Sequence, residues 1–290
     1  MYICNQCPRK CSVDRSDAAG ICGVGQNYKV ARAALHYWEE PCISGKKGSG
    51  TVFFSGCPLK CVYCQNSSIS DGCFGKEISE KRLIEIFKEL EAQGANNINL
   101  VSPTHYAEQL SDTLSKYKPS IPVVYNTGGY DSVDTLKKLE GLVDVFLTDI
   151  KYVSPTVSKK YSRAENYFEV ASKAVLEMRR QQPEDIFEEG ILKKGLIIRH
   201  LVLPGNISQG IKALEWINGN LSSNTIISLM GQYMPCARAS EYPTINRKIN
   251  HREYETVLSK AEMLGFENVY IQELDSSSEE FIPDFDLQGV

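Results

Sequence analysis

The sequence lacks a surplus of basic residues and lacks any long apolar run. Lys and Arg number 32 against 36 Asp and Glu, giving a net charge of −4 at pH 7, whereas nucleic-acid-binding proteins usually carry a basic excess. No apolar stretch approaches the roughly 20 residues that cross a bilayer. The first residues, MYICNQCPRKC, contain no apolar core of a signal peptide. We therefore expect a cytoplasmic protein that has neither nucleic acid nor membrane as a partner.

Cysteine, in contrast, is present in a distinctive arrangement. Seven of the 10 cysteines form two groups, one at Cys4, Cys7, Cys11 and Cys22 and the other at Cys57, Cys61 and Cys64. In a reducing compartment, closely spaced cysteines indicate metal or redox chemistry more often than disulfides. We therefore predict that the two groups bind metal. The remaining three cysteines are more simply explained as buried or free thiols.

Short apolar segments alternate with amphipathic segments from residue 51 onward. The pattern predicts strands at 51–55, 98–101, 122–125, 143–149, 196–202, 225–229 and 269–272, and helices at 79–94, 107–116, 134–139, 167–180, 209–218 and 251–264. The strands are rich in Val, Ile, Leu and Phe with little polar alternation, as buried parallel strands are. This repetition predicts a parallel α/β barrel, complete or partial, with a doubly wound open sheet as the alternative.

The pattern changes near residue 50. Residues 1–50 lack the alternation, so we predict a small cysteine-rich N-terminal extension there and a barrel with a C-terminal tail over residues 51–290. The four cysteines of the extension follow the spacing C-x2-C-x3-C-x10-C. Four thiolates can close a structural zinc site or a second iron–sulfur cluster, and both remain open beside a third alternative of unmetallated thiols.

The second cysteine group lies in a tight loop directly after the first strand of the predicted barrel. The strand TVFFS runs into GCPLKCVYCQN, which places Cys57, Cys61 and Cys64 at C-x3-C-x2-C. Three thiolates can bind three irons of a four-iron cluster and leave the fourth iron for an external ligand, whereas ordinary clusters use four cysteines. A zinc site would need a distant fourth ligand.

This loop resembles the signature of the radical S-adenosylmethionine (SAM) superfamily, including the aromatic Tyr63 before the last cysteine. The resemblance implies a partial (β/α)6 barrel of the TIM type. It also implies a [4Fe–4S] cluster on Cys57, Cys61 and Cys64 whose open iron binds SAM, with Tyr63 against the adenine. Such enzymes cleave SAM reductively to a 5′-deoxyadenosyl radical, which takes a hydrogen atom from the substrate. The electron would come from a low-potential donor such as flavodoxin or ferredoxin.

Weaker similarities at the strand ends extend the resemblance to the enzymes that activate glycyl-radical enzymes, of the pyruvate formate-lyase-activating type. They are carried by VYNTGG, DIK and IIRHLVLPG, over residues from about 51 to 203. By resemblance, the SAM contacts are Asn126, Asp149 and Lys151, with Arg199 beside them.

One turn departs from that pattern. After the second barrel strand these activases carry a Gly-Gly-Glu-like turn, and the present sequence has VSPTHY instead. We expect Ser102 and Thr104 to supply oxygen acceptors for SAM there.

Three functions are compatible with these patterns. The first is a radical SAM enzyme that acts on a protein or peptide, as a glycyl-radical activase does. The second is a radical SAM enzyme with a small-molecule substrate. The third is a non-catalytic iron–sulfur or zinc redox protein, against which the open three-cysteine loop argues, because electron carriers favour fully ligated clusters.

Overall fold

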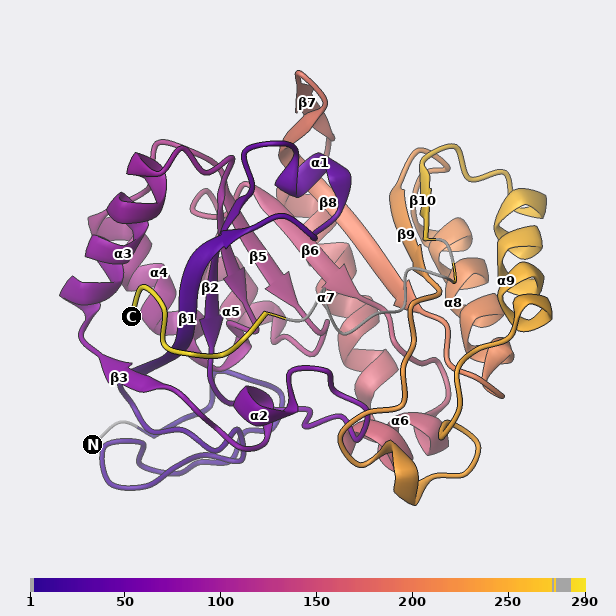
Figure 1. Ribbon diagram of the computed structural model, residues 1–290, viewed down its shortest axis with the longest axis horizontal. Coiled ribbons are helices and arrows are strands. Elements are labelled where there is room, and N and C mark those ends of the chain that lie inside the picture. The colour runs from indigo at the N-terminus through magenta and orange to yellow at the C-terminus, as the bar shows by residue number, and fades with distance from the viewer. Residues whose placement is uncertain (1–2, 273, 275–282) are drawn as a thin grey trace.

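The computed structural model describes residues 3–272, 274 and 283–290, and shows one mixed sheet with helices packed around it (Figure 1). Seven strands of the described chain pair in parallel, in spatial order: β2 (Ser49–Phe54), β4 (Ile98–Val101), β5 (Val123–Thr127), β6 (Val145–Asp149), β8 (Ile191–Leu201), β9 (Ile226–Met230) and β10 (Val269–Ile271). β2, β4, β5 and β6 are buried along their whole length. Their continuous apolar sequences thus reflect burial on both faces, as the sequence predicted.

Helices follow most of the parallel strands. The longer ones are α3 (Glu80–Ala92), α4 (Ala107–Lys116), α5 (Val133–Lys138), α6 (Pro155–Ser162), α7 (Tyr167–Gln181), α8 (Ile207–Asn220) and α9 (His251–Met263). α3 shows why the pattern was readable: Ser79 caps its first turn by accepting a hydrogen bond from the Arg82 amide at 3.2 Å, and one stripe of apolar residues is buried. The predicted strand–helix repetition is confirmed.

The parallel strands curve into a barrel that stays open. Within the described residues, β10 pairs only with β9, while the other end of the parallel series, β2, pairs with an antiparallel strand. The predicted partial barrel is therefore confirmed, and a closed barrel is excluded.

The sequence did not predict the strand that borders β2. This strand, β1 (Tyr28–His36), runs antiparallel to β2 and to the short β3 (Lys76–Ile78). Residues 28–36 therefore belong to the same sheet as the barrel, and the sheet crosses the boundary that we placed at residue 50. The polar segment before β8 contains another short strand, β7 (Ile186–Glu188), which forms a projecting hairpin with β8 (Figure 1).

A short helix, α1 (Pro41–Ser44), fills the barrel at the end where the parallel strands begin. Cys42 and Ile43 are buried there, in one apolar cluster with residues of four strands: Val124, Val145, Leu147, Leu192, Ile197 and Ile226. The core therefore continues through the barrel at this end. The space that remains inside the barrel lies at the opposite end, where the parallel strands finish.

The last residues return to the outer side of β1. The Ala33 amide donates a hydrogen bond to the Gln288 carbonyl at 2.8 Å, and the Leu287 amide donates one to the Ala31 carbonyl at 3.1 Å. Phe285 packs against Phe53 of β2, with ring centroids 5.4 Å apart. This segment fixes the N-terminal strand pair against the barrel.

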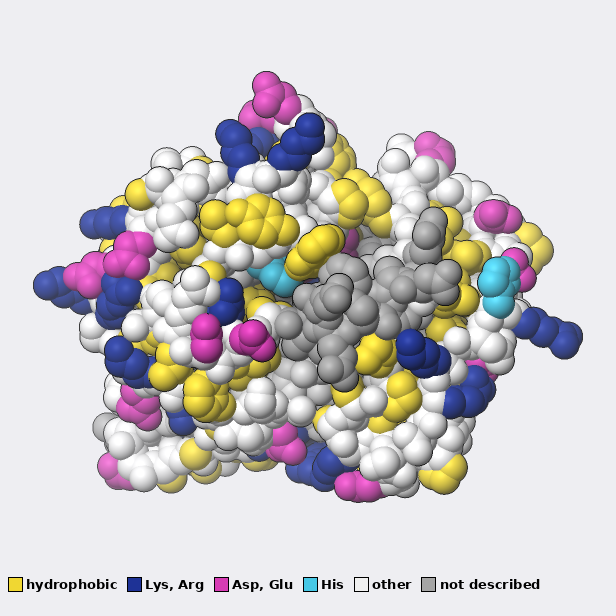
Figure 2. Space-filling view, in the orientation of Figure 1, with side chains coloured by type: hydrophobic (Ala, Val, Ile, Leu, Met, Phe, Trp, Pro, Cys, Tyr) yellow, Lys and Arg dark blue, Asp and Glu magenta, His cyan; other side chains and the backbone are white. Residues whose placement is uncertain are grey.

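The surface carries charged side chains of both signs. On the face shown in Figure 2, basic and acidic side chains are interspersed over the same elements. Among the described helices, none combines the length and apolar character that a membrane span requires.

Candidate active site

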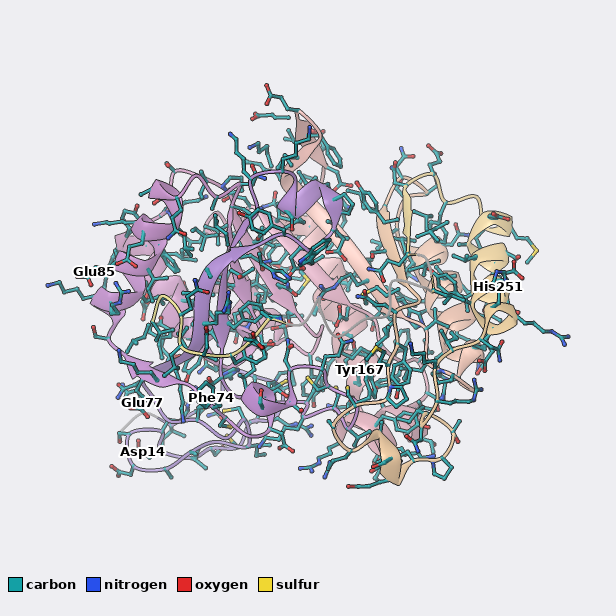
Figure 3. The ribbon with its side chains drawn as sticks, viewed as in Figure 1. Asp14, Phe74, Glu77, Glu85, Tyr167 and His251 are labelled. Carbon is teal, nitrogen blue, oxygen red and sulfur yellow. The ribbon has the colours of Figure 1, made fainter. Side chains whose placement is uncertain are left out.

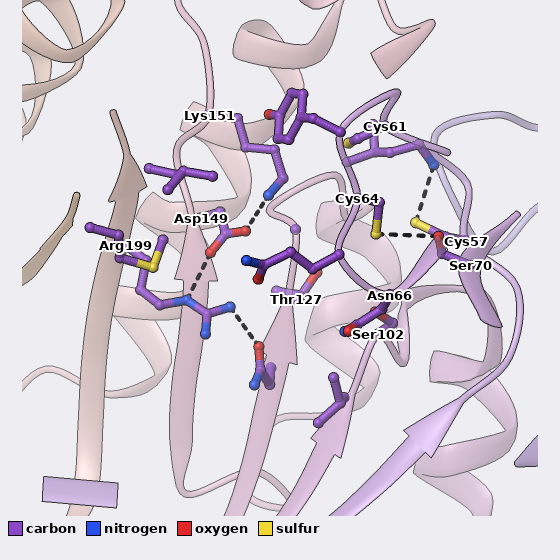
Figure 4. A pocket seen from close by; sticks show the side chains of 18 of the residues that line it. Cys57, Cys61, Cys64, Asn66, Ser70, Ser102, Thr127, Asp149, Lys151 and Arg199 are labelled. Atoms are coloured by element: carbon purple, nitrogen blue, oxygen red, sulfur yellow. Dashed lines mark hydrogen bonds and ion pairs between the residues drawn. The ribbon is translucent and has the colours of Figure 1, made fainter. Parts of the chain in front are cut away.

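The ends of the parallel strands surround a cavity of about 270 Å³ (Figure 4). This position is where α/β barrels carry their functional side chains. All but one of the residues that the sequence predicted to bind the cluster or SAM line this cavity: Cys57, Cys61, Tyr63, Cys64, Ser102, Asn126, Asp149, Lys151 and Arg199. The predicted residue that does not line it is Thr104.

The cysteine loop is held by hydrogen bonds from several elements. At its start Gly56 has φ +86° and donates its amide to Ile69 of α2 (Ser67–Ser70) at 2.8 Å. A side chain at Gly56 would lie 2.8 Å from the Cys22 carbonyl, so glycine is required there. Further along, the Val62 amide donates to the Tyr161 carbonyl at 2.9 Å. The loop conformation is therefore determined by its surroundings.

Two hydroxyl groups contact the sulfur atoms of this loop. Ser70 Oγ donates to Cys64 Sγ at 3.3 Å, and Ser162 Oγ lies 2.9 Å from Cys61 Sγ. Hydrogen bonds of this kind stabilise negative charge on a cysteine sulfur and adjust the potential of a cluster that it binds.

The three thiols fit a cluster better than a single ion. Burial raises the pKa of Cys57 and of Cys64 to about 11 and also raises the pKa of Cys61, so the thiols need a positively charged group to become thiolates. Three thiols on one cavity wall suit a cluster, because each thiolate then binds a different iron.

Paired charges form the wall opposite the cysteines (Figure 4). Arg199 Nε donates to Asp149 Oδ1 at 2.9 Å and Arg199 Nη2 donates to Asn126 Oδ1 at 2.7 Å, while Lys151 Nζ pairs with Asp149 Oδ2. Burial raises the pKa of Asp149, but Arg199 and Lys151 outweigh this effect and hold the pKa below its ordinary value. Asp149 is therefore ionised, between two cations.

Sequence reasoning missed one carboxylate in this network. Glu39 lines the cavity, lies 3.5 Å from Arg199 Nη1 and accepts a hydrogen bond from Asn126 Nδ2 at 3.2 Å. Burial raises the pKa of Glu39 and also that of its neighbour Glu40, although Arg199 opposes the increase in both. Nothing local in the sequence marks these two residues as buried, because their partner Arg199 follows 160 positions later.

Thr104 contributes to a buried polar cluster behind the cavity. Its Oγ1 lies 3.0 Å from Thr127 Oγ1, which donates to Asp131 Oδ2 at 2.6 Å. Tyr125 donates its hydroxyl to the other Asp131 oxygen at 2.9 Å. Ser102, in contrast, lines the cavity from a left-handed backbone conformation of φ +58°. The hydroxyl of Thr104 thus packs inside the fold, whereas Ser102 borders the space.

A cluster of tyrosine side chains packs against the cysteine loop. Tyr63 is buried and its hydroxyl contacts the hydroxyl of Tyr152 at 2.5 Å, while the rings of Tyr161 and Tyr233 pack against it edge-on. Tyr167 of α7 (Figure 3) donates its hydroxyl to the carbonyls of Gly128 and Asp149. These rings connect the cysteine loop to the charged wall through one rigid cluster.

The four N-terminal cysteines lie outside the cavity lining. Cys4, Cys7 and Cys22 are buried and Cys11 is partly exposed. Burial raises the pKa of Cys7 to about 12, and the other three cysteines each add to the increase, so the four thiols share one region. Burial also raises the pKa of Cys22, whereas the charge of Arg15 opposes that increase.

The chain belongs to the radical SAM superfamily. Residues 51–205 match the model of the family described as Radical SAM superfamily, and they contain the cysteine loop, β2 and the strands that carry Asp149 and Arg199. Members of this superfamily are enzymes that use a [4Fe–4S] cluster and SAM, and the donor set at Cys57, Cys61 and Cys64 fits that cluster.

One similar sequence extends the match over nearly the whole chain. An uncharacterized protein of Methanocaldococcus jannaschii, MJ0674, is 32% identical over 277 residues, which cover 92% of this chain and 76% of that protein.

Solved structures of SuiB from Streptococcus suis share the fold. The structure with the precursor peptide SuiA aligns with a TM-score of 0.52 and 14% identity over 78% of this chain and 49% of SuiB. The structure with S-adenosylmethionine aligns with a TM-score of 0.51 and 12% identity over 77% of this chain and 50% of SuiB. The chain therefore spans about half the length of SuiB.

Proposed function

We propose that this chain is a radical SAM enzyme that acts on a protein or peptide, in the manner of a glycyl-radical activase. The observation that carries the proposal is the single cavity in which three cysteines face the paired charges of Asp149, Lys151 and Arg199. Such a cavity offers thiols for a cluster and fixed charges of both signs for the amino and carboxylate groups of SAM.

Different side chains of the cavity would bind the cluster and SAM. Cys57, Cys61 and Cys64 would hold the cluster, which when bound and reduced supplies the electron that cleaves SAM to methionine and a 5′-deoxyadenosyl radical. Lys151 and Arg199 attract a carboxylate, while Asp149 attracts an ammonium group. The surrounding rings and the closed base of the barrel exclude water from the reacting atoms.

The mouth of the cavity supports a peptide as substrate. Trp38 lines the cavity and is 63% exposed, and Met234 and Pro283 border the same space from the other end of the chain. An exposed tryptophan at an opening provides a large, amphipathic contact surface of the kind found at protein interfaces. SuiB, whose fold is similar, has been solved with a precursor peptide bound.

The first test is the production of 5′-deoxyadenosine by anaerobically reconstituted protein that is reduced and given SAM. We expect product from the parent chain and none from a variant carrying Cys57→Ala, Cys61→Ala and Cys64→Ala. A SAM-dependent change in the electron paramagnetic resonance of the reduced cluster gives a second readout in the absence of substrate. No product and no spectral change in the iron-loaded parent would contradict the proposal.

The substrate class needs a separate test. Candidate peptides deuterated at backbone and side-chain carbons are incubated with enzyme and SAM, and deuterium in 5′-deoxyadenosine is measured by mass spectrometry. We expect transfer from a peptide, and we expect Trp38→Ala to raise the KM for that peptide while leaving slow SAM cleavage without substrate unchanged. Transfer only from small metabolites would favour the small-molecule function and overturn the peptide proposal.

A further inference from the structure

The N-terminal cysteines are gathered by their own backbone. The Cys4 amide donates to the Val13 carbonyl at 2.9 Å and the Ser12 amide donates back to the Cys4 carbonyl at 3.0 Å, which brings Cys4 next to Cys11. Gly20 lies beside Cys11 and Cys22, since a Cβ at this glycine would sit 3.4 Å and 3.3 Å from their sulfur atoms. The hairpin and the Gly20 turn therefore converge on one region.

A buried arginine lies beside these cysteines. Arg15 is 1% exposed, and it donates to the carbonyls of His105 and Gly25 at 2.5 Å each. Among the described residues its Nε has no hydrogen-bond partner, and its guanidinium lies 5.1 Å from the centroid of the Tyr106 ring. Neutral carbonyls and an aromatic ring do not neutralise a buried cation, so Arg15 favours negative charge in its neighbourhood.

Four neutral thiols cannot provide that charge, whereas four thiolates on a metal centre carry net negative charge. The spacing of the cysteines indicates which centre. Structural zinc sites usually take their ligands as two pairs, but here three cysteines fall within residues 4–11 and the fourth follows at Cys22. In bacterial ferredoxins with two clusters, each [4Fe–4S] cluster is likewise bound by three close cysteines and one distant cysteine.

We propose that Cys4, Cys7, Cys11 and Cys22 hold a second, fully ligated [4Fe–4S] cluster, with Arg15 as its buried counter-charge. The Cys57 amide donates to the Cys22 carbonyl at 3.1 Å, so this second site is in direct backbone contact with the cysteine loop of the barrel. Arg9 strengthens the contact, because its guanidinium donates to the Pro58 carbonyl at 2.8 Å and to the Arg163 carbonyl at 2.6 Å.

The test counts metal in the whole chain, purified without oxygen and reconstituted with iron and sulfide. We expect about eight irons and eight sulfides per chain, and about four in each of two variants. One carries alanine at Cys57, Cys61 and Cys64, and the other carries serine at Cys4, Cys7, Cys11 and Cys22. Cys73→Ala is the matched control, because Cys73 Sγ also contacts Cys22, at its carbonyl, 3.8 Å away, and we expect that variant to keep about eight irons.

Spectroscopy separates a lost site from a misfolded chain. In the variant without the loop cysteines, we expect the reduced cluster to give a paramagnetic signal that does not change when SAM is added, because all its irons are ligated by cysteine. In the variant without the N-terminal cysteines, the remaining signal should still change with SAM, which would show that the barrel is folded.

Several results would overturn the second cluster. These are about four irons in the parent chain, about one zinc ion per chain in place of the additional iron, or a SAM-sensitive signal in the loop variant. None of these measurements requires SAM cleavage, so they stand apart from the test of the proposed function.

Discussion

The two cysteine groups differ in the surroundings that the fold gives them. The loop cysteines border a cavity, and the cations across it, Lys151 and Arg199, are both paired with Asp149. The N-terminal cysteines lie outside that cavity lining and beside Arg15, a buried cation that donates hydrogen bonds to backbone carbonyls. The comparison teaches that a site for an external ligand keeps free space and balanced charge, whereas a closed metal site needs neither, because the metal and its thiolates provide the balancing charge.

We expect the largest effect from removing Arg199, whose charge is balanced by Asp149 in the cavity. In Arg199→Met, Asp149 and Glu39 lose a buried partner, and breaking such a pair costs about 3–5 kcal/mol. We expect the free energy of unfolding to fall by that amount and the affinity for SAM to fall with it, as measured by urea denaturation and calorimetric titration. Lys173→Met, which removes one exposed ion pair with Glu169, should have a much smaller effect. Equal losses in the two variants would contradict this expectation.

Removing Arg15 tests the site formed by the N-terminal cysteines. In the iron-loaded protein, Arg15→Leu loses charged hydrogen bonds and the counter-charge of the proposed cluster, so we expect a loss of about 1.5–3 kcal/mol in the free energy of unfolding. In chelator-treated protein the loss should be smaller, because a buried cation is removed together with its hydrogen bonds. Parallel denaturation curves with and without iron measure the difference. A loss that does not depend on iron would show that Arg15 is only structural.

Glu39→Gln tests whether the carboxyl group that lines the cavity is protonated in the folded chain. Burial raises the pKa of Glu39 above its ordinary value of 4.5, so the folded chain binds this proton more tightly than the unfolded chain does. Stability therefore falls as the pH rises from 4.5 toward the raised pKa, with a slope of about 1.4 kcal/mol per pH unit for one proton. In denaturation experiments across that pH range, Glu39→Gln should make this slope shallower. Part of the slope should remain, because burial also raises the pKa of Glu40. An unchanged or steeper slope would show that Glu39 is ionised in the folded chain.

The smallest effect is expected from Ser70→Ala, which removes the hydrogen bond to Cys64 Sγ. A neutral hydrogen bond contributes about 1 kcal/mol, which corresponds to a shift on the order of 40 mV for one electron. The donor stabilises the more negative, reduced state, so the potential of the loop cluster should become more negative in the variant. Potentiometric titration of the variant that lacks the N-terminal cysteines isolates this cluster. An unchanged or more positive potential would contradict the assignment.

The barrel could be predicted because its signals are local. A strand such as β4 is a short apolar run, and a helix such as α3 has a capping serine and one apolar stripe, so each can be recognised without its neighbours. The contiguous motifs DIK and C-x3-C-x2-C likewise led directly to Asp149, Lys151 and the cysteine loop.

The features that were missed depend on distant partners. β1 has the sequence YKVARAALH, which shows no clear alternation and is a strand because β2 and β3 pair with its two edges. Glu39 and Glu40 follow exposed aromatic residues, and they come close to Arg199 only because the segment before α1 lies beside β8. Thr104, for which SAM binding stays a prediction, belongs to a 3-10 turn at Thr104–Tyr106 and does not line the cavity, a local geometry that the letters VSPTHY do not reveal.

The helix α1 has a kinetic consequence. Since α1 fills the barrel where its strands begin, the cavity resembles a tube with one end closed, and reactants and products use the same mouth. The molecule that binds deeper must therefore enter first and leave last. For two reactants, such a shape imposes an ordered sequence of binding and release, and the outer reactant controls when the spent inner one can be exchanged.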